Sequence, residues 1–245
     1  SHLMKNSEWG ACAYLSKSKY GLNTTDIMVN NITLENSTKS VYGVTGCTSN
    51  STLEGATTIT IETINGTTGD TANGGVYTWN QKTGTTASST GTIYGIYDLS
   101  GGLWERTADY VANQNINLKE YGASIAYEGE NLKTESTKYT TVYPHDSTTD
   151  NTSISDTETN LNTASINNWK ANTLIYGDGI RETSISGVGD TSWYNDGSYF
   201  LWLYDTFSIR GAPHNSGSSA GLFYFGRNDG NSHYYIGFRA TVIVS

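Results

Sequence analysis

Apolar residues near the start of the chain recur at the spacing of a helix that buries one side. The pattern predicts a helix over residues 6–20, which Asn6 or Ser7 can cap. Glu8 falls in the first turn, where the helix dipole favours a carboxylate, and Gly21 is a residue type that ends helices. The apolar stripe consists of Trp9, Cys12, Ala13 and Leu15.

A long polar stretch follows, and short segments typical of strands lie inside it. Residues 22–92 are rich in threonine, serine, asparagine and glycine. Within them, residues 57–64 alternate threonine with isoleucine and lead into an Asn65-Gly66 turn. Residues 76–79, Val-Tyr-Thr-Trp, form a second such segment. These patterns predict short strands joined by polar loops.

Residues 91–110 carry the strongest local pattern of the chain. Apolar and aromatic residues alternate with glycine up to a turn that begins at Ser100 and continues with two glycines. After this turn, Trp104 and Glu105 begin a predicted strand. The end of the chain is also well patterned, because residues 236–244 read as one strand.

The region between these two patterns is polar. Residues 111–190 are weakly patterned and most diffuse around 147–168, which we interpret as a surface excursion. No repeat of fixed period is found. The whole chain, 1–245, is therefore predicted to form a single α+β domain that is low in helix, with polar surface excursions near 22–90 and 113–175.

The composition indicates a folded protein that faces the outside of a cell or virion. Charged residues make up 15% of the chain, against about 25% in typical soluble proteins. The 18 tyrosines and 6 tryptophans argue against disorder, because disordered segments are poor in aromatic residues. The bias toward threonine, tyrosine, glycine and asparagine is typical of turns and short strands.

Charge and hydropathy exclude two classes of partner. The chain has 14 Lys and Arg against 23 Asp and Glu, a formal net charge of −9. Phosphate backbones and anionic headgroups repel such a protein. The longest apolar run, residues 199–204, is far shorter than the ~20 residues of a spanning helix. We therefore expect no nucleic-acid partner and no membrane insertion.

Three blocks that span nearly the whole chain carry a family resemblance. They are Met4–Leu15, then Gly95–Glu105, then a closing set formed by Ile209–Ala212, Ala220–Gly221 and Gly237–Arg239. In this order they resemble the Glu-Trp helix, the Tyr-Asp-Met-Ser-Gly-Asn-Val-Trp-Glu block and the final Gly-Phe-Arg strands of the formylglycine-generating enzyme (sulfatase-modifying factor) family. The resemblance implies an α+β, C-type-lectin-like fold with small twisted antiparallel sheets, two helices and long irregular loops.

Within that family, the second half of the chain resembles variable proteins of diversity-generating retroelements from phages and gut bacteria. The shared pattern comprises Ser192–Tyr194, Tyr199–Phe200, Arg210–Gly211, Ala220–Phe225 and Phe238–Arg239. The resemblance implies a rigid scaffold that displays a variable ligand-binding segment, here 191–236. It also implies a phage tail or a bacterial cell surface as the location, and leaves oligomerisation open.

The family's oxidase activity is not expected here. Formylglycine-generating enzymes use two copper-binding cysteines in their closing segment, whereas residues 210–245 contain none. Cys12 and Cys47 lie elsewhere and allow either one disulfide or two buried thiols. We interpret His214 and His233 as exposed loop histidines, so the sequence predicts no catalytic residue and no cofactor.

Metal binding is also not expected. Oxygen ligands for calcium exist, but no compact loop with alternating acidic positions holds them. Instead, we expect Asp98 to cap the turn at Ser100 and Glu105 to form a buried hydrogen bond or ion pair with Arg210 or Arg239. The carboxylates considered as calcium ligands are Asp98, Glu105, Asp109, Asp178 and Asp190.

Residues 193–235 combine aromatic side chains with small polar ones, as antibody binding surfaces do. The alternation assigns Phe200, Phe207, Leu222, Phe223, Phe225 and Phe238 to the core. The expected ligand-contacting set, named here the display residues, comprises Trp202, Tyr204, Asp205, His214, Asn215, Arg227, Asn228, Asp229, Asn231, His233 and Tyr234.

The sequence thus predicts a non-enzymatic receptor-binding protein or adhesin. Its expected partner is a protein or a glycan on a target cell, since aromatic rings beside carboxylates and amides also bind sugars. Two alternatives stay open: an oxidase of the formylglycine-generating type, and a purely structural component of a virion or cell surface.

Overall fold

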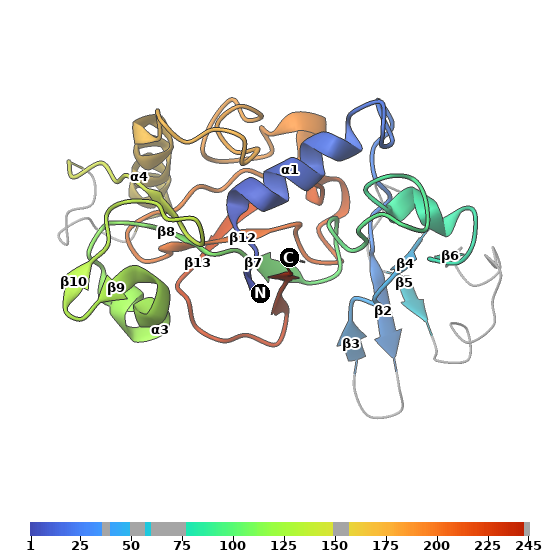
Figure 1. Cartoon of the computed structure of the whole chain (residues 1–245), viewed down its shortest axis with the longest axis horizontal. Coiled ribbons are helices and arrows are strands. Elements are labelled where there is room, and N and C mark those ends of the chain that lie inside the picture. Colours follow the sequence, from blue (N-terminus) through green and yellow to red (C-terminus); the bar gives the residue numbers. More distant parts are fainter. Residues whose placement is uncertain (36–39, 50–56, 60–76, 149–156, 243–245) are drawn as a thin grey trace.

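Three α-helices and several small sheets make up the described part of the chain (Figure 1). The computed structural model describes residues 1–35, 40–49, 57–59, 77–148 and 157–242. The architecture there is mixed α+β and contains no barrel. The helices are α1 (Asn6–Ser16), α3 (Ile116–Ala126) and α4 (Glu158–Ala171). No helix of the described residues is long and apolar enough to cross a membrane.

A four-stranded sheet forms the centre, in the order β13-β12-β7-β14. Its strands are β7 (Trp104–Arg106), β12 (Phe207–Arg210), β13 (Phe225–Asn228) and β14 (Ile236–Phe238). Strand β12 pairs antiparallel with both neighbours, and β14 pairs parallel with β7. The predicted strand at Trp104 and Glu105 is therefore confirmed, and the three resembling blocks meet around this sheet.

Smaller pairings surround the central sheet. Strands β1 (His2–Leu3) and β15 (Ala240–Thr241) pair, so both ends of the chain lie together (Figure 1). The parallel pair β8–β11 extends the core toward α3 and α4. The remaining strands are β2 (Ile32–Glu35), β3 (Ser40–Tyr42), β4 (Cys47–Thr48), β5 (Thr57–Ile59), β6 (Tyr77–Thr78), β8 (Asp109–Val111), β9 (Tyr127–Glu128), β10 (Asn131–Leu132) and β11 (Thr141–Tyr143).

Helix α1 is shorter than predicted and has a different cap. It ends at Ser16, and Lys5 rather than Asn6 or Ser7 precedes its first turn. The Lys5 backbone N–H donates to the Glu8 carboxylate at 2.8 Å, which confirms the expected role of Glu8 in the first turn. Asn6 is instead the first residue of the helix, and its side chain is fully buried.

The resemblance implied two helices, whereas the described residues form three, of 11, 11 and 14 residues, so the chain is low in helix as expected. Two of them, α3 and α4, lie in residues 111–190, where the sequence shows no clear period. The described part of the 147–168 segment is mainly the helix α4 rather than an irregular excursion. The Asn65-Gly66 turn and most of the 57–64 strand fall outside the described residues, and β5 covers the start of that strand.

The core predictions hold with one exception. The side chains of Phe200, Phe207, Leu222, Phe223 and Phe225 are at most 5% exposed. Phe238 was assigned to the core but is 71% exposed. It lies at the end of the edge strand β14, and the predicted 236–244 strand breaks at the next residue, Arg239, before β15. The side chain of Arg239, rather than that of Phe238, points into the protein to pair with Glu105.

A buried polar network crosses the core beneath α1. Asn6 donates from Nδ2 to the Asp109 carboxylate at 2.6 Å and to the Tyr143 hydroxyl at 3.0 Å. Tyr143 in turn donates to Asp178 at 2.7 Å. Arg210 is 0% exposed and lies in the electrostatic field of the Asp109 and Asp178 carboxylates. A buried network of this size favours one arrangement of the core, because each buried polar group must keep its hydrogen-bond partner.

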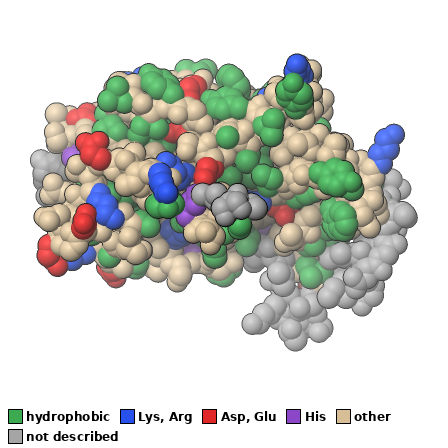
Figure 2. All heavy atoms as spheres, viewed as in Figure 1, with side chains coloured by type: hydrophobic (Ala, Val, Ile, Leu, Met, Phe, Trp, Pro, Cys, Tyr) green, Lys and Arg blue, Asp and Glu red, His purple; other side chains and the backbone are tan. Residues whose placement is uncertain are grey.

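Uncharged side chains dominate the face of the molecule that Figure 2 shows. Figure 2 shows hydrophobic side chains scattered among polar uncharged ones over this face of the molecule, with few Lys, Arg, Asp and Glu between them. On this face, the low charge content of the sequence is therefore visible as a largely neutral surface.

Candidate functional site

Two adjoining cavities are lined by residues of the 199–235 segment and by Trp104 of strand β7. The larger, of about 370 Å³, is lined by Trp104, Tyr199, Trp202, Asp205, Ile209, Tyr224, Gly226, Arg227, Asn228 and Tyr235. The smaller, of about 290 Å³, is lined by Trp104, Pro213, His214, Asn215, Tyr234 and Tyr235. The cavities share Trp104 and Tyr235, and together we name them the aromatic groove.

The two shared residues form the wall between the cavities. The rings of Trp104 and Tyr235 meet edge to face with centroids 5.1 Å apart, a favourable geometry for aromatic pairs. Their backbones are also joined, since the Trp104 N–H donates to the Tyr235 carbonyl at 3.2 Å. The centroid of the His233 ring lies 3.5 Å from that of the Tyr235 ring. The parallel pairing of β14 with β7 thus fixes the centre of the groove.

Arg227 holds the floor of the larger cavity. Its guanidinium carbon lies 3.2 Å from the centroid of the Trp202 ring, a close cation–π contact. Nη1 donates to the Ser165 hydroxyl on α4 at 3.0 Å, and Nε lies 3.8 Å from the Asp205 carboxylate. Burial raises the pKa of Asp205, and the charge of Arg227 partly offsets this effect. Arg227 therefore contacts both Trp202 and Asp205 and holds their side chains in place.

Replacing Arg227 by lysine is expected to lower the free energy of unfolding by about 2 kcal/mol, nearly as much as alanine does. A lysine keeps the charge but cannot stack flat on Trp202 while bonding Ser165 and Asp205. Urea denaturation of both variants checks this. Lys82→Ala, which changes an exposed cation, serves as the control. Full stability in Arg227→Lys would show that charge alone matters at this position.

The structure gathers most of the display residues but not all of them. Those that line the aromatic groove are Trp202, Asp205, His214, Asn215, Arg227, Asn228 and Tyr234. Those outside its lining are Tyr204, Asp229, Asn231 and His233. Asn231 accepts from Arg106 through its backbone carbonyl, and its N–H donates to Asp229 at 2.9 Å. These last contacts shape the turn beside the groove.

The interpretation of His214 as an exposed histidine was wrong. His214 is only 6% exposed, and burial lowers the pKa of its ring. Its backbone N–H donates to the Gly102 carbonyl at 2.8 Å, which draws the 212–215 loop onto the turn before β7. His233, by contrast, is exposed as expected.

Sequence reasoning missed four aromatic residues that line the groove. Tyr199, Tyr224 and Tyr235 lie in the aromatic-rich segment but were left out of the display residues. Trp104 comes from the distant Trp-Glu motif, and no signal within residues 191–236 indicates its presence. The parallel β7–β14 pairing, which joins segments 132 residues apart at the Trp104–Ile236 position, is what brings it there.

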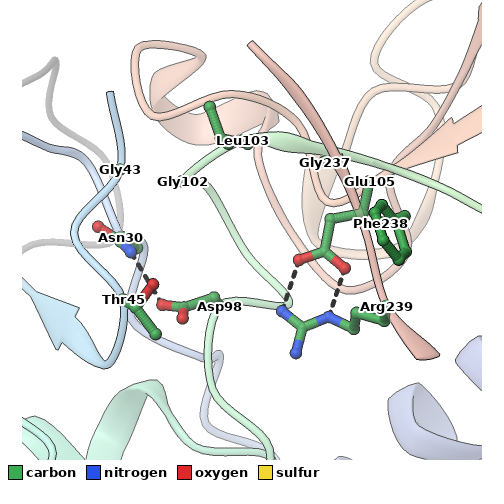
Figure 3. A pocket seen from close by; sticks show the side chains of 10 residues that line it. All are labelled: Asn30, Gly43, Thr45, Asp98, Gly102, Leu103, Glu105, Gly237, Phe238 and Arg239. Carbon is green, nitrogen blue, oxygen red and sulfur yellow. Dashed lines mark hydrogen bonds and ion pairs between the residues drawn. The ribbon is translucent and has the colours of Figure 1, made fainter. Parts of the chain in front are cut away.

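A third cavity, of about 260 Å³, is lined by residues of β7 and β14 and by the segments around Asn30, Gly43 and Asp98 (Figure 3). Glu105 and Arg239 form a two-point ion pair in its wall, so the expected partner of Glu105 is confirmed as Arg239. Burial raises the pKa of Glu105 to about 7, against the opposing effect of Arg239. This pair ties β7 to the segment after β14.

Asp98 has a role different from the expected turn cap. Its carboxylate accepts from Asn30 Nδ2 at 2.8 Å (Figure 3). It also accepts from the Gly46 N–H at 3.1 Å. Burial raises its pKa, and these hydrogen bonds oppose the shift. Asp98 thus fastens the loop before β4 to the end of the 91–98 segment instead of capping at Ser100.

The acidic, histidine and cysteine side chains of the described residues form neither a metal-binding cluster nor a disulfide. The described residues contain no group of three or more His, Cys, Asp or Glu side chains placed to hold a metal ion. Cys12 and Cys47 are free thiols, so the disulfide alternative is not the one observed. Burial raises the pKa of both, that of Cys47 to about 11, which favours the unreactive thiol form.

Comparisons of the chain with protein-family models, with curated proteins and with solved structures gave no match. The function is therefore inferred from the residues and their geometry. The feature that combines concavity, aromatic walls and polar groups from several segments is the aromatic groove.

Proposed function

We propose that the protein is a non-enzymatic receptor-binding protein or adhesin, and that the aromatic groove binds a protein or glycan on a target cell. The observation that carries the proposal is the convergence of Trp202, Asn215, Arg227 and Tyr234 into one concave surface. Aromatic rings there supply contact area at low entropic cost, and asparagines supply adaptable hydrogen bonds. A phage tail or a bacterial cell surface is the proposed location.

We further propose that the fold is C-type-lectin-like, of the sulfatase-modifying-factor type. Support comes from contacts between the three resembling blocks. Met4 of the first block donates its backbone N–H to the carbonyl of Arg239, in the third block, at 3.0 Å. Glu105 of the second block pairs with Arg239 of the third. The blocks thus pack on one another around the central sheet, as parts of a shared scaffold would.

Binding is favoured over catalysis by the positions of the two thiols. An oxidase of the formylglycine-generating type needs two cysteines that bind copper together, whereas Cys12 and Cys47 pack in different clusters of the core. Neither lines the aromatic groove. A thiol-peptide oxidation assay with copper checks this point, and turnover that survives loss of both cysteines would contradict it.

The proposed role as a variable protein predicts where the gene differs between clones of its source population. Substitutions are expected to concentrate at groove positions such as His214, Asn215 and Tyr234. Arg210 and Gly211 are expected to stay unchanged, because one is fully buried and the other has a φ of +80° against the Leu99 carbonyl. Sequencing many clones checks this. Equal variation over the whole gene would remove the retroelement mechanism.

The binding function itself is tested with labelled protein and mixed bacterial cells from that source. The wild-type protein is expected to stain a subset of the cells, and the Asn215→Ala, Tyr234→Ala double variant is expected to lose at least tenfold of that staining. Tyr94→Ala is the matched control, because Tyr94 is 89% exposed and lies outside the groove. Equal staining by all proteins would assign binding to another surface.

A further inference from the structure

We propose that the ligand of the aromatic groove is an uncharged oligosaccharide of at least two pyranose rings. This inference rests on the proposed binding function and names the class of ligand. It follows from the shape of the groove, from its charge, and from the side chains that form its walls.

The shape favours a small ligand over a protein surface. Each cavity, of about 290 and about 370 Å³, is concave and near the lower end of the range for small-molecule sites, roughly 300–1,000 Å³. A stable protein interface instead requires about 800 Å² on each partner, usually as a broad and flatter patch. The groove therefore fits an elongated ligand that enters both cavities.

The charge favours a neutral ligand. Among the described residues that line the groove, Asp205 and Arg227 carry the charges, and their side chains lie 3.8 Å apart. An anionic ligand would compete with Asp205 for Arg227, and a cationic one would compete with Arg227 for Asp205. His214 adds little positive charge near neutral pH, because burial lowers its pKa. The lining thus offers no uncompensated charge to an ionic ligand.

The walls supply the two kinds of contact that a sugar ring requires. The rings of Trp104, Tyr234 and Tyr235 line the smaller cavity, and aromatic rings can pack against the C–H groups of a pyranose. Tyr234 is 74% exposed, so its ring is accessible to a ligand. The amide of Asn215 lines the same groove and can both donate to and accept from hydroxyl groups. Asn228 can donate from Nδ2, since its Oδ1 already accepts from Arg106 and from the Gly230 N–H.

The position of the shared wall predicts two subsites. Trp104 and Tyr235 line both cavities, so rings bound on either side contact the same aromatic pair. A disaccharide that spans the wall makes contacts in both cavities but loses translational freedom only once, whereas two separate monosaccharides would each lose it. We therefore expect a disaccharide or longer chain to bind at least tenfold more tightly than its component monosaccharide.

The test uses an array of neutral hexose and N-acetylhexosamine oligosaccharides, with sialylated and uronate-containing glycans as the charged comparison. The wild-type protein is expected to bind neutral members. Tyr235→Ala is expected to lose at least tenfold of that affinity, whereas Tyr235→Phe and Tyr94→Ala retain it. Tyr235 is used because Trp104 also packs on Val29 and Tyr224, so its loss would disturb folding. Binding confined to charged glycans, or equal binding by Tyr235→Ala, would overturn the proposal.

A parallel arm separates this inference from the proposed function. Source cells are treated with periodate, which cleaves sugar rings, before staining with the labelled protein. Loss of staining, together with neutral array binding, supports the oligosaccharide. Staining that survives periodate, with an empty array, overturns the sugar proposal while the binding function stands with a protein ligand. No staining of untreated cells and no array binding would overturn both.

Discussion

Replacing Arg210 by alanine is expected to lower the free energy of unfolding by about 3–5 kcal/mol at neutral pH, the range for breaking a buried ion network. Arg210 is 0% exposed, lies over the Trp9 ring at 5.5 Å and donates to the Leu222 carbonyl. Asp178 and Asp109 are its largest carboxylate neighbours in electrostatic effect. Alanine would leave these buried carboxylates without their compensating cation.

The loss is expected to be smaller near pH 5 than near pH 7, because the carboxylates can then be neutralised by protons instead of by Arg210. Urea denaturation at both pH values measures it. Lys119→Ala is the control, since the Lys119–Glu130 pair lies on the surface and its loss should not change stability measurably. An equal loss at both pH values would show that Arg210 acts through packing rather than charge.

The parts of the fold that the sequence predicted share a strong local pattern. Trp104 and Glu105 follow a glycine turn and begin β7, as expected. Glu105 was expected to form a buried hydrogen bond or ion pair with Arg210 or Arg239, and Arg239 is its partner. The buried aromatic residues between 200 and 225 were identified in the same way, from alternation.

The helices α3 and α4 escaped prediction because many of their buried positions are small or polar, although Leu118 and Trp169 are buried as well. In α4, Ser165 and Asn168 are fully buried and donate to the carbonyls of Phe200 and Leu201. Such positions read as solvent-facing in a hydropathy pattern. In α3, Gly122 is buried against the Phe207 ring, and a Cβ at this position would collide with that ring. Tertiary contacts, which no local pattern carries, fix both helices.

The candidate site was predictable in composition but not in arrangement. Residues 193–235 have the side chains of a binding surface, and several of them line the groove. Their roles depend on neighbours distant in sequence. Arg227 was expected to face a ligand, yet it bonds Ser165 of α4 and stacks on Trp202. Trp104 enters through strand pairing across the chain.

The free energy of unfolding is expected to decrease as the pH rises from about 5 to about 8. Burial raises the pKa of Asp178 to about 6 and that of Glu105 to about 7, both above the values of ordinary carboxyls. Between the unfolded and folded pKa values, the folded state therefore holds more protons than the unfolded state, so stability falls as these protons are lost. Burial raises the pKa of Asp109 and Asp196 as well, in the same direction.

The shifts of Asp178 and Glu105 correspond to about 3 kcal/mol each, at 1.36 kcal/mol per pKa unit, and two variants separate them. Asp178→Asn should flatten the decrease mainly between about pH 4 and 6, and Glu105→Gln mainly between about pH 5 and 7. Urea denaturation at closely spaced pH values measures both slopes, with the exposed Glu130→Gln as control. Stability that stays level or rises over this range would mean that the two carboxyls are ionised in the fold, held by Arg210 and Arg239 rather than by protons.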